Sequence, residues 1–171
     1  MNELDDTWSQ MLRTAIEKAR STGRDEVADY LELKATNDTV RTIGTQWLME
    51  SMIEIAAAQE NESLGVAIEK TAPHRFDHLS AKLVGARLTL RHGVRCLSLE
   101  AGWTRTPADG FMRGGALAVA KLSHFGMPKH NEVLYLSSPE GVPVWKIVKP
   151  LGEPKMATTA DLRRHFSLFL G

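Results

Sequence analysis

The first 60 residues have the hydrophobic periodicity of helices. Apolar residues recur every three or four positions from Trp8 to Ala19, which places them on one side of an amphipathic helix, and Gly23 follows as a stop. The same periodicity continues over residues 25–60. Four poor helix formers, at 36–39, interrupt it, so this range is either one helix or two, and we favour two.

From about residue 64 the pattern changes to the alternation of strands. The runs 82–91 and 94–103 flank His92 and Gly93, two residues that tolerate the positive φ of a tight hairpin turn. That turn would set Arg91 opposite Val94 and Leu88 opposite Leu97. The buried face would then carry Ala86, Leu88, Leu90, Leu97 and Leu99. The other face would carry Arg87, Thr89, Arg91, Cys96, Ser98 and Glu100.

Three further segments, 66–69, 132–137 and 142–148, also have the character of strands, and a loop over 71–75 follows the first of them. The segment 116–125 is ambiguous. Its alanines favour a helix, but its place between strands favours a strand, which we prefer. Thr158 and Asp161 have the spacing of a capping box and so predict a helix from there to the C-terminus.

These elements predict an α+β fold in one domain spanning residues 1–171. Helices would occupy residues 1–63, an antiparallel meander of five or six strands residues 64–150, and a terminal helix residues 158–170. Helices grouped before and after a run of strands are typical of a sheet that is covered on one face.

The composition is that of a globular protein, with 43% hydrophobic and 25% charged residues. Cys96 is the one cysteine, so the chain can form neither an internal disulfide nor a Cys-x-x-Cys zinc pair. The N-terminus is acidic, unlike a secretory signal, and the most apolar stretch, 47–58, falls short of the roughly 20 residues of a membrane span. We therefore expect a cytoplasmic protein that does not enter the membrane.

The net charge is zero, but the charges are unevenly distributed. Residues 1–72 contain 7 Lys and Arg against 14 Asp and Glu, a net charge of −7, whereas residues 73–171 contain 14 against 7, a net charge of +7. All six histidines lie in the second part. The basic part could attract an anionic partner, or the two parts could neutralise each other within the molecule.

Motifs for common chemistry are missing. The chain has no Gly-x-Ser-x-Gly, P-loop or Gly-x-Gly-x-x-Gly sequence, which argues against many hydrolases and nucleotide enzymes. His74 and His78 have the i, i+4 spacing of two metal ligands on a helix, but Pro73 and Phe76 predict a loop there. We expect no metal site and no cofactor.

The candidate binding residues lie on the predicted hairpin and in the loop that follows it. Arginine forks recognise phosphate and carboxylate groups, and long loops on a rigid scaffold often bind ligands. The candidates are Arg87, Arg91, Trp103, Arg105, Asp109, Phe111 and Arg113.

The sequence therefore favours a non-enzymatic binding or regulatory module whose basic sheet and 103–115 loop engage an anionic ligand, a nucleic acid or an acidic protein. One alternative is an enzyme with a pocket between that loop and the helices, using Arg105, Asp109 and His124. Another is a homo-oligomer, such as a homodimer, or an assembly adaptor with Trp8 and Trp47 at the interface.

Overall fold

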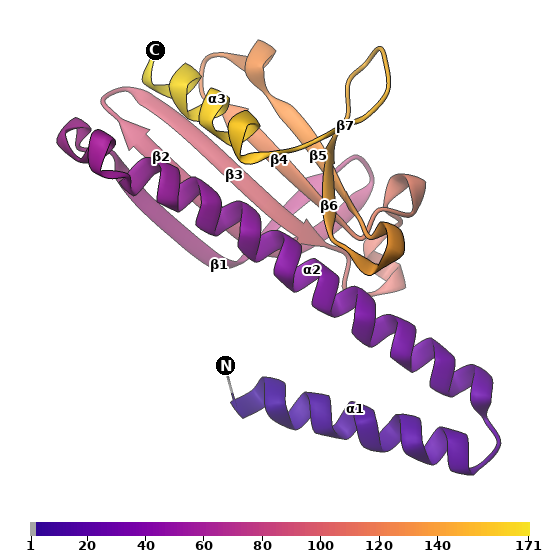
Figure 1. Cartoon of the computed structure of the whole chain (residues 1–171). Coiled ribbons are helices and arrows are strands. Elements are labelled where there is room, and N and C mark those ends of the chain that lie inside the picture. The colour runs from indigo at the N-terminus through magenta and orange to yellow at the C-terminus, as the bar shows by residue number, and fades with distance from the viewer. Residues whose placement is uncertain (1–2) are drawn as a thin grey trace. The chain divides into compact units, whose positions relative to one another are not determined.

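The computed structural model describes residues 3–171, with side chains from Asp6 onward. The fold is α+β, as predicted: helices α1 (Glu3–Ser21) and α2 (Asp25–Ala57) precede an antiparallel sheet, and helix α3 (Thr159–Leu170) follows it (Figure 1). The chain divides into two compact units, one ending at Thr39 and the other running from Val40 to Gly171. The single domain stays a prediction.

Helix α2 is continuous, so the predicted break at residues 36–39 is wrong. The Thr36 hydroxyl donates a hydrogen bond of 3.0 Å to the carbonyl oxygen of Glu32, and the Thr39 hydroxyl donates one of 3.0 Å to that of Ala35. Bonds of this kind accommodate threonine inside a helix. The run of poor helix formers instead coincides with the boundary between the two units.

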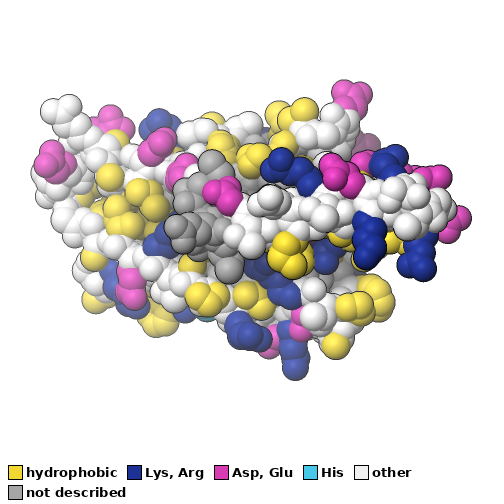
Figure 2. Space-filling model, turned by 90° about the horizontal axis from the view of Figure 1, so that it is seen from below, with side chains coloured by type: hydrophobic (Ala, Val, Ile, Leu, Met, Phe, Trp, Pro, Cys, Tyr) yellow, Lys and Arg dark blue, Asp and Glu magenta, His cyan; other side chains and the backbone are white. Residues whose placement is uncertain are grey.

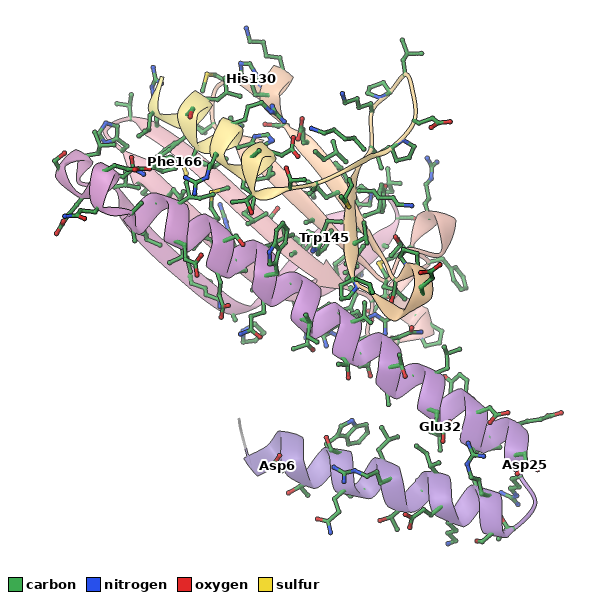
Figure 3. The ribbon with its side chains drawn as sticks, in the orientation of Figure 1. Asp6, Asp25, Glu32, His130, Trp145 and Phe166 are labelled. Carbon is green, nitrogen blue, oxygen red and sulfur yellow. The ribbon has the colours of Figure 1, made fainter. Side chains whose placement is uncertain are left out.

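The first unit is a helical hairpin whose apolar residues are only partly covered. Ala19 and Ala28 are buried, and the Arg20 guanidinium donates a hydrogen bond of 2.7 Å to the carboxylate of Glu32, which is labelled in Figure 3. Several large apolar side chains are more than half exposed: Trp8, Met11, Tyr30 and Leu33. Hydrophobic side chains at the protein surface are visible among charged ones in Figure 2. Within residues 3–171, no helix combines the length and apolar character that crossing a bilayer requires.

The described strands form one sheet with seven members in chain order, one more than the upper number predicted. They are β1 (Ala67–His78), β2 (Ala81–His92), β3 (Arg95–Trp103), β4 (Ala118–His124), β5 (Glu132–Ser137), β6 (Val144–Ile147) and β7 (Lys155–Met156). Strand β7 has two residues, too few to give an alternating pattern. The ambiguous segment 116–125 contains β4, as we preferred, because its small residues Ala118 and Ala120 are fully buried beneath the helices.

Helix α3 and the part of α2 from Val40 onward cover one face of this sheet (Figure 1). The core between them includes Leu48, Met52 and Phe169, together with Trp145 and Phe166, which are labelled in Figure 3. The Trp145 indole donates a hydrogen bond of 2.8 Å to the carbonyl oxygen of Gly44 on α2. The capping box of Thr158 and Asp161 is present at the start of α3, as predicted.

The β2–β3 hairpin turns at Gly93 and Val94 rather than at His92 and Gly93. Gly93 has φ of +57° and occupies the first turn position, where type II′ turns take glycine. The pairing is therefore two residues away from the predicted one: Arg91 faces Cys96, and Leu88 faces Leu99. A shift of two residues leaves each side chain on its predicted face, because the side-chain period of a strand is two.

The face of the sheet away from α2 and α3 curls over itself. Strand β1 continues through the segment 71–75 that was predicted as a loop, with a bulge between Thr71 and His74. His74 lies opposite Gly85, which in turn lies opposite Gly102, and a side chain on either glycine would overlap the neighbouring strand. A bulge beside a pair of glycines allows strong local coiling. The end of β1 consequently bends across the open face.

Candidate functional site

The curled end of the sheet encloses a small second core. Ala81, Leu83 and Val119 are buried there, and the partly buried Phe76 and Met112 pack against them. Phe76 belongs to the bent end of β1, so this core lies inside the curl. It fixes the position of the polar side chains that surround it.

Next to this core lies a cavity of about 580 Å³, which we call the basic pocket. Its walls come from the β1–β2 turn, the segments around residues 113 and 129–131, the start of β5, the chain after β6, and α3. The lining residues are His78, Leu79, Arg113, Lys129, His130, Asn131, Glu132, Val133, Tyr135, Ile147, Val148, Lys149, Pro150 and Arg164. Four are Lys or Arg, and of the described lining residues only Glu132 is acidic.

The pocket opens because strand β6 is short. Its four residues pair with Leu134–Ser137 of β5, and beyond them only the Val148 amide still bonds β5, through the carbonyl oxygen of Val133 at 3.2 Å. The chain then leaves the sheet at Pro150. The first residues of β5 are thus left bordering the cavity.

Two aromatic residues join β1 to β5 at the pocket. His78 Nε2 and the Tyr135 hydroxyl share a hydrogen bond of 2.7 Å. Burial, with the positive charges of Lys121 and Arg113, lowers the pKa of His78 below its usual value. His78 is therefore neutral at pH 7 and contributes a polar wall without adding charge.

Glu132 connects the pocket to the interior. One of its oxygens accepts a hydrogen bond of 2.8 Å from the Arg164 guanidinium, and the other accepts one of 2.8 Å from His165 Nε2. Burial alone would raise the pKa of Glu132, but the bonds from His165 and Arg164 outweigh it and hold the pKa below its ordinary value. Glu132 is ionised at pH 7.

Two stacked histidines extend this network into the core. His165 Nδ1 lies 2.8 Å from Nε2 of His124, and the two side chains are 0% and 3% exposed. Burial, then the neighbouring His165 and His130, lowers the pKa of His124 to about 4. Burial also lowers the pKa of His165, although its bond to Glu132 acts in the opposite direction. Both imidazoles are neutral at pH 7.

The structure brings Arg87 and Arg91 together at the other end of the open face. They line a groove of about 460 Å³, the Arg87–Arg91 groove, with Cys96, Ser98 and Ser123 among its other residues. The Arg87 guanidinium donates a long hydrogen bond of 3.3 Å to the Ser98 hydroxyl. The groove is lined by few apolar side chains, chiefly the exposed Val94 and Phe125.

The candidates of the 103–115 loop do not converge on one site. Only Arg113 lines the basic pocket. The Arg105 guanidinium lies 4.0 Å above the Trp103 ring and donates a hydrogen bond of 3.0 Å to the carbonyl oxygen of Val84. Asp109 accepts hydrogen bonds from the backbone amides of Arg105 and Thr106 and so holds the loop in shape, and Phe111 is 86% exposed.

The three residues of the enzyme alternative lie toward opposite ends of β3. Arg105 and Asp109 follow the end of β3, whereas His124 pairs with Leu97 near the beginning of that strand. His124 lines the Arg87–Arg91 groove, whereas Arg105 and Asp109 do not. Within the described residues, moreover, no three His, Cys, Asp or Glu side chains are grouped so as to hold a metal ion.

Sequence reasoning missed most of the residues at the basic pocket. Lys129, Lys149 and Arg164 come from separate segments, and no local motif connects them. His78 was considered only as a metal ligand paired with His74, whose Nε2 instead lies 2.7 Å from the Glu100 carboxylate. The one available signal was the excess of Lys, Arg and His after residue 73.

No family model matches the chain, and no curated protein or solved structure is significantly similar to it. The function of the basic pocket must follow from its own chemistry.

Proposed function

We propose that the protein is a binding module that holds a small organic anion, with a phosphate or carboxylate head, in the basic pocket. The observation that carries the proposal is the convergence of Arg113, Lys129, Lys149 and Arg164 around one cavity that contains a single acid, Glu132, among its described residues. Cations gathered from separate segments repel one another, and an anion relieves that repulsion.

The pocket walls favour a ligand that also has an apolar part. Val133, Val148 and Pro150 offer apolar surface beside the charged side chains, and Tyr135 adds an aromatic side chain. Small-molecule sites are typically mostly apolar with a few polar groups that fix the ligand. An aromatic or aliphatic phosphate or carboxylate would use both kinds of wall.

The size of the cavity favours a small molecule over a polymer. About 580 Å³ lies within the range of roughly 300–1,000 Å³ for small-molecule pockets. A nucleic acid needs a basic surface that follows its backbone over several phosphates. The Arg87–Arg91 groove, a second basic site, is lined by different residues from the basic pocket.

A calorimetric titration of the full chain with phenyl phosphate, at pH 8 and low ionic strength, tests the proposal. We expect saturable binding of one equivalent, weaker binding of inorganic phosphate, and no tighter binding of a short single-stranded oligonucleotide. Lys149→Ala and Arg113→Ala should each weaken phenyl phosphate binding by about tenfold or more, the effect of losing a charged hydrogen bond.

Matched controls lie elsewhere on the second unit. Lys82→Ala and Arg163→Ala remove exposed cations that do not line the pocket and should leave the affinity unchanged. If phenyl phosphate fails to bind, or if the control variants weaken its binding as much as the pocket variants do, the proposal is wrong. Tighter binding of the oligonucleotide would instead favour a nucleic-acid partner.

A homodimer is the second candidate function, and the exposed side chains of the first unit favour it. Trp8, Met11 and Tyr30 are each more than half exposed. Large apolar residues of this kind are enriched at interfaces between chains. Sedimentation of the full chain tests this candidate, and a monomer mass at high concentration would exclude it.

A further inference from the structure

The basic pocket and the buried histidines are joined by a continuous line of hydrogen bonds. It runs from Arg164 through Glu132 and His165 to His124, and each of its three bonds is 2.8 Å long. Nδ1 of His124 is buried and has no hydrogen-bond partner within the described residues. The line thus begins at the pocket and ends at an unpaired ring nitrogen in the core.

We propose that anion binding in the basic pocket is coupled to the uptake of one proton by the hydrogen-bonded side chains Glu132, His165 and His124, which we call the buried network. This inference rests on the proposed function, because it concerns the regulation of the same pocket.

The hydrogen-bond partners fix where the protons are. Glu132 is ionised and can only accept, so Nε2 of His165 must carry a proton. His165 is neutral, so its Nδ1 carries none and accepts the bond from Nε2–H of His124. His124 is neutral as well, so its unpaired Nδ1 holds a free lone pair. Among the four ring nitrogens of these two histidines, it is the one that has neither a proton nor a hydrogen-bond donor among the described residues.

A proton that reaches Nδ1 of His124 can transfer its charge to the side of the pocket through the existing hydrogen bonds. When it bonds to Nδ1 of His124, the Nε2–H bond of that ring can break as an N–H bond forms at Nδ1 of His165. His124 is then neutral again, and His165 is an imidazolium in contact with Glu132. The net change is one proton gained.

Anion binding favours this protonated state because Glu132 lines the pocket. A bound phosphate is attracted by Arg164 but repelled by the neighbouring Glu132 carboxylate. An imidazolium at His165 offsets the charge of Glu132. By linkage, a ligand that prefers the protonated state raises the proton affinity of the buried network.

Other charged groups also face the buried network. The lining segments contribute Arg113, Lys129, Lys149 and His78, the turn before β5 contributes His130, and α3 contributes Asp161 and Arg164. His130 and His78 are imidazoles that line the pocket themselves. The experiment must separate them from His165.

The test is calorimetry with phenyl phosphate at pH 6, in two buffers of different ionisation enthalpy, on the wild type and on His165→Gln. Glutamine can still donate to Glu132 but does not titrate. We expect His165→Gln to bind as the wild type does at pH 8, and to take up fewer protons than the wild type at pH 6, by at most one. Phenyl phosphate itself titrates in the same way with both proteins, so its contribution cancels in the difference in proton uptake between them.

As the pH falls from about 7 to 5, the affinity of the wild type for phenyl phosphate should rise more steeply than that of His165→Gln. The difference between the two slopes should be at most tenfold per pH unit, which is the limit for one linked proton. Equal proton uptake by the two proteins would overturn the inference, as would uptake that His130→Gln or His78→Gln abolishes and His165→Gln retains. Absence of phenyl phosphate binding at pH 8 would instead refute the proposed function.

A second variant covers the case in which the buried substitution prevents folding. Glu132 is partly exposed, and Glu132→Gln removes the carboxylate that joins the basic pocket to the buried histidines. It should bind phenyl phosphate more tightly than the wild type at pH 8 and lose the extra pH dependence. If the pH dependence of Glu132→Gln matches that of the wild type, the coupling does not exist.

Discussion

Nε2 of His78 in β1 lies 2.7 Å from the hydroxyl oxygen of Tyr135 in β5, although β2, β3 and β4 stand between these strands in the sheet. In a flat sheet the two strands would be about 19 Å apart. The contact exists because β1 bends over the open face after its bulge at Thr71 and His74. This bend brings the β1–β2 turn to the segments that carry the cations of the basic pocket.

Replacing Tyr135 with phenylalanine should destabilise the protein by about 1 kcal/mol, because it leaves the half-buried His78 without its partner. Urea denaturation measures the change. Tyr30→Phe is the matched control, since Tyr30 is 64% exposed and should tolerate the change within about 0.5 kcal/mol. Equal effects of the two substitutions would mean that the His78–Tyr135 bond does not hold the curl.

Gly85→Ala should destabilise the protein by about 3 kcal/mol, because the new Cβ would overlap the carbonyl oxygen of Ala101 on β3. Gly114→Ala is the control. Gly114 has φ of +63° but open space around its Cβ position, so the cost should be about 1 kcal/mol. Thermal unfolding compares them. A well-tolerated alanine at Gly85 would show that β2 and β3 are not so closely paired there.

The free energy of unfolding should fall as the pH is lowered from about 6.5 to 4. The pKa of His124 in the folded protein is about 4, below its ordinary 6.5, so the unfolded chain binds a proton first as the pH falls. The loss should be up to about 3 kcal/mol, and stability should be constant above pH 7 with respect to this group. His124→Asn should flatten the profile. Equal stability of the wild type at pH 5 and pH 8 would contradict the buried, neutral histidine pair.

Asp161→Ala should cost about 1–2 kcal/mol of stability, because α3 loses its N-terminal cap and α3 closes the core. Asp109→Ala removes the same kind of capping carboxylate from the three-residue turn Pro107–Asp109, and should cost less than about 0.5 kcal/mol since that turn is exposed. Denaturation midpoints measure both. A larger loss for Asp109 would mean that the 103–115 loop is more important to the fold than its packing indicates.

Local patterns were sufficient to predict most elements of the fold. Alternation in the β2–β3 hairpin assigned Leu88 and Leu99 to the core, even though the turn lies one residue later than predicted. Spacing of Thr158 and Asp161 located the start of α3. Pro73 was misleading, because proline usually ends a strand, whereas here it lies at the bulge that bends β1.

The candidate site was harder to predict, because it is made by contacts that are distant in sequence. Arg87 and Arg91 were correctly placed on one face, since alternation alone decides this. Of the 103–115 loop, only Arg113 reaches the basic pocket, where it meets Lys149 and Arg164. No periodicity links these three residues. Their convergence depends on the early end of β6 and on the curl of β1.

A crystal structure of the full chain with phenyl phosphate tests the central claim most directly. We expect the phosphate to lie among Arg113, Lys129, Lys149 and Arg164, with the phenyl ring against the apolar wall at Val133 and Val148. Phenyl phosphate in the Arg87–Arg91 groove, or an empty basic pocket at saturating concentration, would contradict the account.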